Sequence, residues 1–294
     1  MPPPPADRRW LDTFLAWYFV SVWGSGYLAT RVGLEYAAPF TFLTLRFAVG
    51  VALMIPVVLW LRPRWPATRR ELGHVVVAGV LMHAVNLGGS HYTQYLGLSA
   101  GITALLLSAQ PLLTAIVASR WLHERLAPAQ WTGVALGLAG VALVVWHKID
   151  VRAMTVGALI AVTISLAAVT AGTLYQRFFC AGVDLRGAPL VQFAASLAVM
   201  APLAWAVEGL RIDWSWPLVA AVAFLVILAS ILAVNALHVL MRRGQAARVT
   251  TLLYLTPIFA VLLEYLMFGE VPSALSLAGI AVTCLGVALV AWRR

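Results

Sequence analysis

Polar side chains that could bind a small molecule recur inside otherwise apolar stretches of this chain. His83, Asn86 and Ser90 follow helical spacing and share one face, and Ser108 and Gln110 stand beside a proline. Polar groups are costly in an apolar environment unless they face a cavity or a partner helix. We therefore predict a substrate site lined by hydrogen-bonding groups and an apolar wall. The predicted lining residues are Trp17, His83, Asn86, Ser108, Gln110, Ser165, Asn235, His238, Tyr254 and Thr256.

Pro111 and Pro257 lie in the middle of apolar segments and are the predicted hinges or helix breaks. Proline removes a backbone donor and frees a carbonyl oxygen, and in carriers such breaks line the substrate site. A tolerated kink is the alternative. For the hydroxyl groups the alternative is a hydrogen bond within the helix or one that joins two helices. For Trp17 and Tyr254 the alternative is ordinary packing.

Two charged residues stand inside apolar segments. Arg46 is the one cation there, and its side chain could extend to the membrane surface. We predict a structural or gating charge at Arg46, with a substrate contact as the alternative. Glu264 lies about one turn from a segment end and is predicted to be solvated, with proton or cation binding as the alternative.

Two motifs of enzymes and ATP-driven transporters are missing. The sequence has no His-Glu-x-x-His and no P-loop. Cys180 and Cys284 lack metal-ligand spacing with histidine. We predict no enzymatic activity, no metal and no cofactor. An intramembrane hydrolase that uses Ser230 and His238 is a remote alternative.

The elements that must position these residues are long and apolar. Of 294 residues, 62% are hydrophobic and 11% are charged, and the mean hydropathy is +0.91. Soluble domains are about a quarter charged, so lipid must cover most of this surface. A membrane helix needs about 20 apolar residues. We predict an all-α integral membrane protein with ten transmembrane helices near 11–30, 40–61, 72–95, 101–120, 129–146, 155–176, 188–207, 217–240, 246–268 and 274–292.

The net charge of +9 does not indicate nucleic-acid binding, because the basic residues lie in short loops between the predicted spans. With a cytoplasmic N-terminus, 15 of the 20 Lys and Arg residues fall on the inside and 4 on the outside. This bias follows the positive-inside rule. We therefore predict that both termini are cytoplasmic and that no nucleic acid is bound.

The sequence matches itself at a shift of 146 residues. Apolar composition alone does not produce Pro, Glu, Gly and Trp matches in one register. We predict two halves, 1–147 and 148–294, each with five spans. An odd number of spans inverts the second half in the membrane, which is the architecture of alternating-access carriers. The matching pairs include Pro111–Pro257, Glu124–Glu270, Gly133–Gly279, Gly140–Gly286 and Trp146–Trp292.

The chain resembles the drug/metabolite transporter superfamily in its ten-helix form with two EamA-type repeats. The first half has the pair Trp23-Gly24 and the arginine Arg46, and the second half departs from this pattern. It lacks the Trp-Gly pair, and Ser196 or a neighbour stands where the arginine would repeat, so no role is carried over for a second arginine. The resemblance implies export of amino acids, metabolites or drugs, with the amino-acid exporters, including the aromatic type, as the similar group. It rests on Trp23-Gly24-Ser25, Pro39, Leu45-Arg46-Phe47, Tyr95, Ser99-Ala100, Pro111, Glu124, Gly133 and Gly140, and on Pro257, Glu270, Gly279 and Gly286.

These observations predict a secondary transporter that exports small metabolites, with neutral or aromatic amino acids as the first candidates. Export of drugs or other metabolites is the alternative. The predicted partners are the small-molecule substrate and the lipid bilayer. Small residues at Gly133, Gly137 and Gly140 share one face and predict close helix packing, with a homodimer contact as the alternative. The resemblance implies a bacterial inner (plasma) membrane location. Uniport, proton antiport and substrate exchange all fit the sequence.

Overall fold

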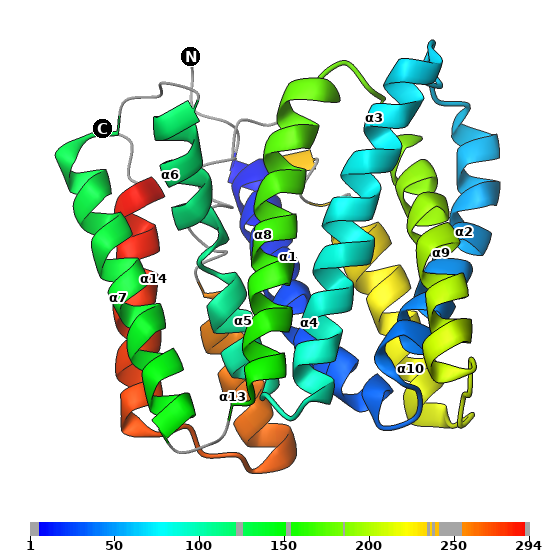
Figure 1. The fold of residues 1–294 in the computed structure, drawn as a ribbon. Helices are drawn as coiled ribbons and strands as arrows, with labels where there is room; N and C mark the ends of the chain where they lie inside the picture. The colour runs from blue at the N-terminus through cyan, green and yellow to red at the C-terminus, as the bar shows by residue number, and fades with distance from the viewer. Residues whose placement is uncertain are drawn as a thin grey trace. The chain divides into compact units, whose positions relative to one another are not determined.

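The protein is all-helical in the computed structural model, which describes residues 6–121, 126–150, 154–184, 186–233, 236, 239–240 and 255–291. Within these ranges no β-strand forms, and one isolated bridge joins Ala37 to Ile212. The all-α prediction is therefore confirmed for the described residues. The helices, shown in Figure 1, are α1 (Ala6–Leu34), α2 (Pro39–Leu61), α3 (Arg69–Gly79), η1 (Val80–Val85), α4 (Asn86–Tyr95), α5 (Ala100–Leu107), α6 (Gln110–Trp121), α7 (Pro128–Asp150), α8 (Val156–Phe179), α9 (Ala188–Glu208), α10 (Trp216–Ala223), η2 (Phe224–Ala233), α13 (Thr256–Phe268) and α14 (Ala274–Ala291).

Seven helical stretches in the described residues are long and apolar enough to cross a bilayer, by length and composition. Two shorter apolar helices follow them, Thr256–Phe268 and Ala274–Val290. The number of ten spans stays a prediction. The seven stretches are Pro39–Leu61, Arg69–Tyr95, Ala100–Arg120, Pro128–His147, Val156–Phe179, Ala188–Glu208 and Trp216–Ala233.

Local sequence signals set the helix ends. Ser99 Oγ accepts the N–H of Ile102 at 3.4 Å where α5 begins, and Thr155 Oγ1 accepts the N–H of Ala158 at 3.1 Å where α8 begins. Such side chains satisfy backbone donors that have no partner within the helix. Gly209 follows the last residue of α9 and takes the left-handed conformation (φ 69°) that glycine adopts without strain.

The chain divides into two compact units. Unit 1 comprises Met1–Ala29, Ser99–Arg152 and Ile227–Arg294, and unit 2 comprises Thr30–Leu98 and Ala153–Val226. Each unit takes residues from both halves of the sequence. The compact units therefore differ from the predicted halves 1–147 and 148–294, which stay a prediction about ancestry.

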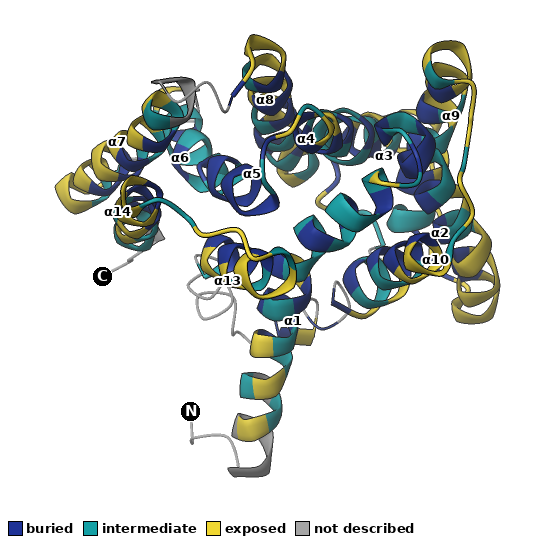
Figure 2. Cartoon of the chain, turned by 90° about the horizontal axis from the view of Figure 1, so that it is seen from below, coloured by how far each residue is buried: buried dark blue, intermediate teal, exposed yellow. Residues whose placement is uncertain are grey.

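In unit 2, α2 packs along α9, and α4 packs along α8 (Figures 1 and 2). The rings of Phe47 on α2 and Phe193 on α9 meet edge to face, with centroids 5.3 Å apart. A Cβ added at Gly50 would lie 2.6 Å from the Phe193 ring, so glycine permits this approach. Phe47 and Phe193 are separated by 146 positions, which is the shift at which the sequence matches itself.

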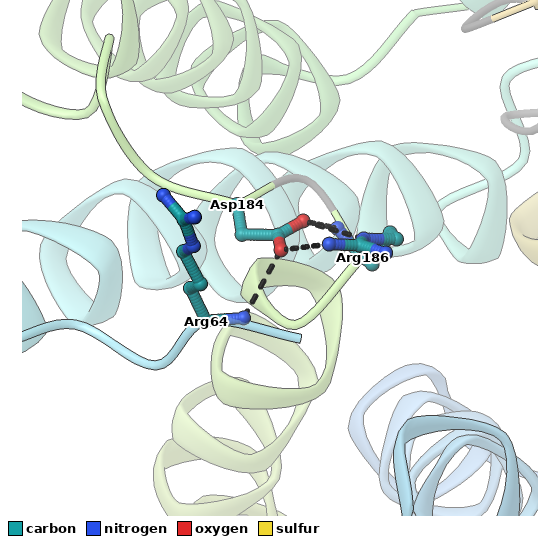
Figure 3. Close-up of polar contacts among 3 residues, drawn as sticks. All are labelled: Arg64, Asp184 and Arg186. Carbon is teal, nitrogen blue, oxygen red and sulfur yellow. Dashed lines mark hydrogen bonds and ion pairs between the residues drawn. The ribbon is translucent and has the colours of Figure 1, made fainter. Parts of the chain in front are cut away.

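Polar contacts join the segment that follows α2 to the loop before α9. Asp184 Oδ2 accepts the backbone N–H of Arg64 at 3.1 Å and the Arg186 Nη2 donor at 2.7 Å (Figure 3). Arg186 Nε also donates to Asp184 Oδ1 at 3.0 Å. The side chain and backbone N–H of Arg186 hold the pKa of Asp184 well below its usual range. This exposed-loop carboxylate is therefore charged under ordinary conditions.

A second carboxylate joins the opposite ends of the same two helices. Glu208, the last residue of α9, accepts the backbone N–H of Phe40 at 3.0 Å and that of Thr41 at 2.7 Å. The Thr41 hydroxyl donates to the same carboxylate at 2.7 Å. Glu208 thus caps the start of α2, although it lies 168 positions after Phe40 and 167 after Thr41. The sequence did not reveal this contact.

In unit 1, α7 and α14 run antiparallel and touch through small residues. A Cβ added at Gly133 would lie 2.6 Å from Gly286 O, and one added at Gly140 would lie 2.7 Å from Gly279 O. Since Gly133 contacts the later part of α14 and Gly140 the earlier part, the two helices point in opposite directions. Close backbone approach of this kind requires residues without bulky side chains.

Candidate functional site

A chain of polar side chains crosses unit 2 at the level of His83. His83 lies in the π-helical segment η1, and its Nε2 is 3.3 Å from Gln192 Oε1 on α9. Gln192 Nε2 donates to Gln176 Oε1 on α8 at 3.1 Å. The sequence analysis predicted His83 but neither glutamine. A glutamine within the apolar 188–207 segment was the signal available, and Gln192 stands 146 positions after Arg46.

The two π-helical segments occupy equivalent places in the two sequence halves. A shift of 146 moves η1 from 80–85 to 226–231, inside η2. A π-helical turn is wider than an α-helical turn and is frequent at functional sites. The periodicity of apolar residues did not predict either segment, because one extra residue in a turn leaves no compositional mark.

Asn86 and Ser165 are predicted site residues that the structure brings together within unit 2. The Ser165 hydroxyl lies 2.7 Å from Asn86 O and 2.8 Å from Asn86 Oδ1, and Ser165 is fully buried. Asn86 Nδ2 donates to Met82 O in the π-helical segment at 3.0 Å. These contacts join α4 to α8, so in this structure Ser165 acts as a link between helices.

Arg46 is buried in unit 2, with only 8% of its surface exposed. The predicted extension of its side chain to the membrane surface is wrong, since such a side chain would be largely exposed. A charge held inside a membrane protein is costly unless it has a structural or functional role.

In unit 1 the helix that carries Pro111 is interrupted. α5 ends at Leu107 and α6 begins at Gln110, with a turn over Ser108 and Ala109 between them. The Ser108 hydroxyl donates to Leu105 O at 2.6 Å, and the Thr114 hydroxyl donates to Gln110 O at 2.9 Å. Pro111 sits in the first turn of α6, where its missing N–H removes no helical hydrogen bond.

Pro257 holds the matching place in the first turn of α13, which begins at Thr256. Thr256 is 6% exposed, and its Oγ1 has no hydrogen-bond partner among the described residues. A Cβ added at Gly24 on α1 would lie 3.2 Å from Thr256 O, so this glycine lets α1 approach the start of α13. Trp17, 43% exposed, meets Phe259 at a ring-centroid distance of 6.1 Å.

Glu264 is buried, and the prediction of a solvated side chain is wrong. It is 4% exposed, and its carboxylate accepts the backbone N–H of Ala100 at 2.8 Å and that of Gly101 at 3.1 Å. Those donors form the first turn of α5, where the helix dipole favours a negative charge. Glu264 therefore joins α13 to α5. Its partners lie 163 and 164 positions earlier, which is why sequence periodicity could not identify them.

The predicted site residues that the structure describes are divided between unit 1 and unit 2. Three other predicted site residues, Asn235, His238 and Tyr254, lie outside the described residues. No group of three metal-ligating side chains occurs in the part of the chain that the structure describes. Unit 1 holds Trp17, Ser108, Gln110, Pro111, Thr256, Pro257 and Glu264, while unit 2 holds Arg46, His83, Asn86 and Ser165.

Several known proteins are similar to this chain. The chain is 27% identical to the "Uncharacterized inner membrane transporter YedA" of Escherichia coli strain K12, over 92% of this chain and 87% of that protein. It is 24% identical to the "Probable amino-acid metabolite efflux pump" of Salmonella typhimurium strain LT2, over 94% of this chain and 93% of that protein. A solved crystal structure shares the fold with a TM-score of 0.66 and 20% identity, covering 95% of this chain and 96% of that chain.

The description "EamA-like transporter family" matches the chain twice, over residues 13–146 and 155–292. The two matched ranges together cover nearly the whole sequence. Seven helical stretches of the described residues are long and apolar enough to cross a membrane. The protein is therefore a multi-pass membrane transporter that belongs to the EamA-like transporter family.

Proposed function

We propose that this transporter exports small metabolites, with neutral or aromatic amino acids as its first substrates. The observation that carries the proposal is the set of neutral hydrogen-bonding groups within apolar helices, among them His83, Asn86, Gln110 and Thr256. A zwitterionic amino acid has no net charge, and amide, hydroxyl and backbone groups can solvate both of its ends. A sugar phosphate or nucleotide sugar would bring several negative charges into the same low-dielectric surroundings, at a prohibitive cost.

The name of one relative supports this choice of substrate. The Salmonella protein described as a probable amino-acid metabolite efflux pump matches over 94% of this chain. At 24% identity, this likeness supports the same class of substrate for the two proteins rather than the same individual substrate. Export of drugs or of other metabolites is the second candidate within the family.

Alternating access of two inverted halves is the proposed mechanism. It is supported by contacts between positions related by the 146-residue shift. Phe47 meets Phe193 in unit 2, and Gly137 meets Thr283 in unit 1. Two segments related by a two-fold axis touch at equivalent residues where they cross that axis. Inverted repeats let one chain take inward-open and outward-open forms by exchanging the conformations of its halves.

For location we propose ten spans in a bacterial inner membrane, with both termini in the cytoplasm. The name of the Escherichia coli relative, an inner membrane transporter, supports the location. The excess of basic residues in alternate loops supports the orientation.

Transport by the purified protein in proteoliposomes tests the proposed function. Labelled neutral and aromatic amino acids, a sugar phosphate and a cationic drug are presented separately. We expect amino-acid flux above that of empty liposomes and no flux of the sugar phosphate. Flux of the drug alone would favour the second candidate, and flux of the sugar phosphate without any amino acid would contradict the proposal.

A further inference from the structure

Two buried side chains on α4 carry polar atoms that the helix packing leaves unused. His91 is 2% exposed and Gln94 is 9% exposed. They are three residues apart and share a helix face. His91 Nε2 lies 3.3 Å from Thr30 Oγ1, but His91 Nδ1, Gln94 Oε1 and Gln94 Nε2 have no hydrogen-bond partner among the described residues. Buried polar atoms without partners destabilise a fold, so their grouping calls for a ligand or another reason.

Arg46 brings a positive charge to the part of unit 2 where α2 meets His91. It lies on α2, four residues after Phe42, whose ring centroid is 5.6 Å from that of His91. Residues four apart share a helix face, so Arg46 stands one turn along the face that meets His91. A guanidinium presents paired donors whose geometry matches the two oxygens of a carboxylate.

We propose that Arg46, His91 and Gln94 bind the α-carboxylate and α-ammonium groups of the transported amino acid. The Arg46 guanidinium and an N–H of His91 donate to the carboxylate. Gln94 offers both a donor and an acceptor, so its Oε1 accepts from the ammonium group while its Nε2 donates to the carboxylate. This inference rests on the proposed export of amino acids and names the part of the substrate that is recognised.

The proposed site predicts which substrate groups matter. A carboxylate that binds a buried arginine forms charge-assisted hydrogen bonds, which are roughly twice as strong as neutral ones. Substrates should therefore share the amino-acid head group, while their side chains vary. A role for Arg46 in helix packing alone would make no distinction between an amino acid and its ester.

The experiment measures competition against labelled phenylalanine, or against another neutral amino acid that the wild type transports, in proteoliposomes. The competitors are the unlabelled amino acid, its methyl ester, the decarboxylated amine and the deaminated acid. For the wild type we expect the ester and the amine to compete roughly tenfold to a hundredfold more weakly than the amino acid, as loss of a charged hydrogen bond implies.

Three variants separate binding from folding. Arg46→Gln should weaken competition by the amino acid about tenfold or more and remove the preference for the amino acid over its ester. Arg46→Lys should keep that preference. Gln94→Leu should weaken the amino acid relative to the deaminated acid, because only the former needs an acceptor. Arg62→Gln removes an exposed charge just beyond the end of α2 and should behave as the wild type.

Several outcomes would overturn the inference. Equal competition by the ester and the amine in the wild type would do so, as would an unchanged preference in folded Arg46→Gln. If Arg46→Gln does not fold, two other results decide against the site. They are an unchanged ratio of amino-acid to deaminated-acid affinity in Gln94→Leu, and equal competition by the amino acid, the ester and the amine in the wild type. Transport of carboxylates but of no amino acid would contradict the proposed function while supporting Arg46 as a carboxylate site. Transport of amines or uncharged drugs alone would contradict both.

Discussion

The Thr283 hydroxyl lies 3.5 Å from the carbonyl oxygen of Gly137, the residue 146 positions earlier in the chain. This interval is also the shift at which Pro111 falls on Pro257 and Gly133 on Gly279. Around it, the contact of Gly133 with Gly286 is matched by that of Gly140 with Gly279. Exchange of the two halves turns the first contact into the second, which is the relation expected at a local two-fold axis.

The small residues of this contact should be sensitive to one added methyl group. At Gly140 a Cβ would lie 2.7 Å from Gly279 O and 2.7 Å from Thr283 N, and backbone atoms cannot move aside cheaply. We expect Gly140→Ala to destabilise the protein by about 1–3 kcal/mol, measured by thermal unfolding in detergent. Gly73→Ala is the matched control, because nothing lies within 4 Å of its added Cβ. Equal melting temperatures for both variants would contradict the close contact.

Loss of the Glu264 charge should loosen the contact between α13 and α5. Glu264→Gln keeps the shape but replaces an anion that accepts two backbone N–H groups at 2.8 and 3.1 Å. Hydrogen bonds to charged groups contribute about 1.5–3 kcal/mol, so we expect a stability loss of that order and slower transport. Glu35→Gln, at an exposed acid, is the control. A variant as stable as this control would show that the carboxylate is not needed.

Replacement of the helix-break prolines should impair transport more than folding. Alanine at Pro111 or Pro257 supplies a backbone N–H and permits a continuous helix, which biases the chain toward one conformation. We expect membrane expression near the wild-type level and reduced flux in proteoliposomes for both variants. Wild-type flux in both would remove the hinge interpretation.

Reporter fusions should reveal the orientation of the spans. A reporter after Arg70 should be cytoplasmic, and reporters near Ser99 and Ser273 should be external. Ser99 precedes α5 and Ser273 precedes α14, so the two sites test both halves of the sequence. A cytoplasmic signal near Ser273 would contradict the inverted second half.

Acid should weaken the loop that Asp184 organises. Because Arg186 lowers the pKa of Asp184 in the folded protein, the carboxylate stabilises the fold above its unfolded pKa of about 3.9, and the effect is lost as pH falls through the folded pKa. We expect the wild-type melting temperature to exceed that of Asp184→Asn at pH 6 and the difference to shrink below about pH 4. High salt should also reduce it, since Arg186 is exposed. A difference independent of pH would argue against a role of the charge.

Amino-acid type and local order determined that these segments are helices and supplied caps at several of their ends. Ser99 and Thr155 satisfy backbone donors within three residues, and each predicted apolar segment corresponds to a helix wherever the structure describes it. In lipid a backbone must satisfy its own hydrogen bonds, so length and hydropathy suffice to predict helices. The position of Pro111 likewise marked the break between α5 and α6, because proline acts on its own turn.

Only the tertiary structure decided which charges are buried and what they touch. Glu264 and Ala100 are 164 positions apart, and Glu208 and Phe40 are 168 apart, so no local pattern records these contacts. Whether Arg46 reaches the surface depends on which face of α2 meets α4. A polar side chain within an apolar helix predicts that a partner exists, but the packing of distant helices chooses that partner and sets its distance.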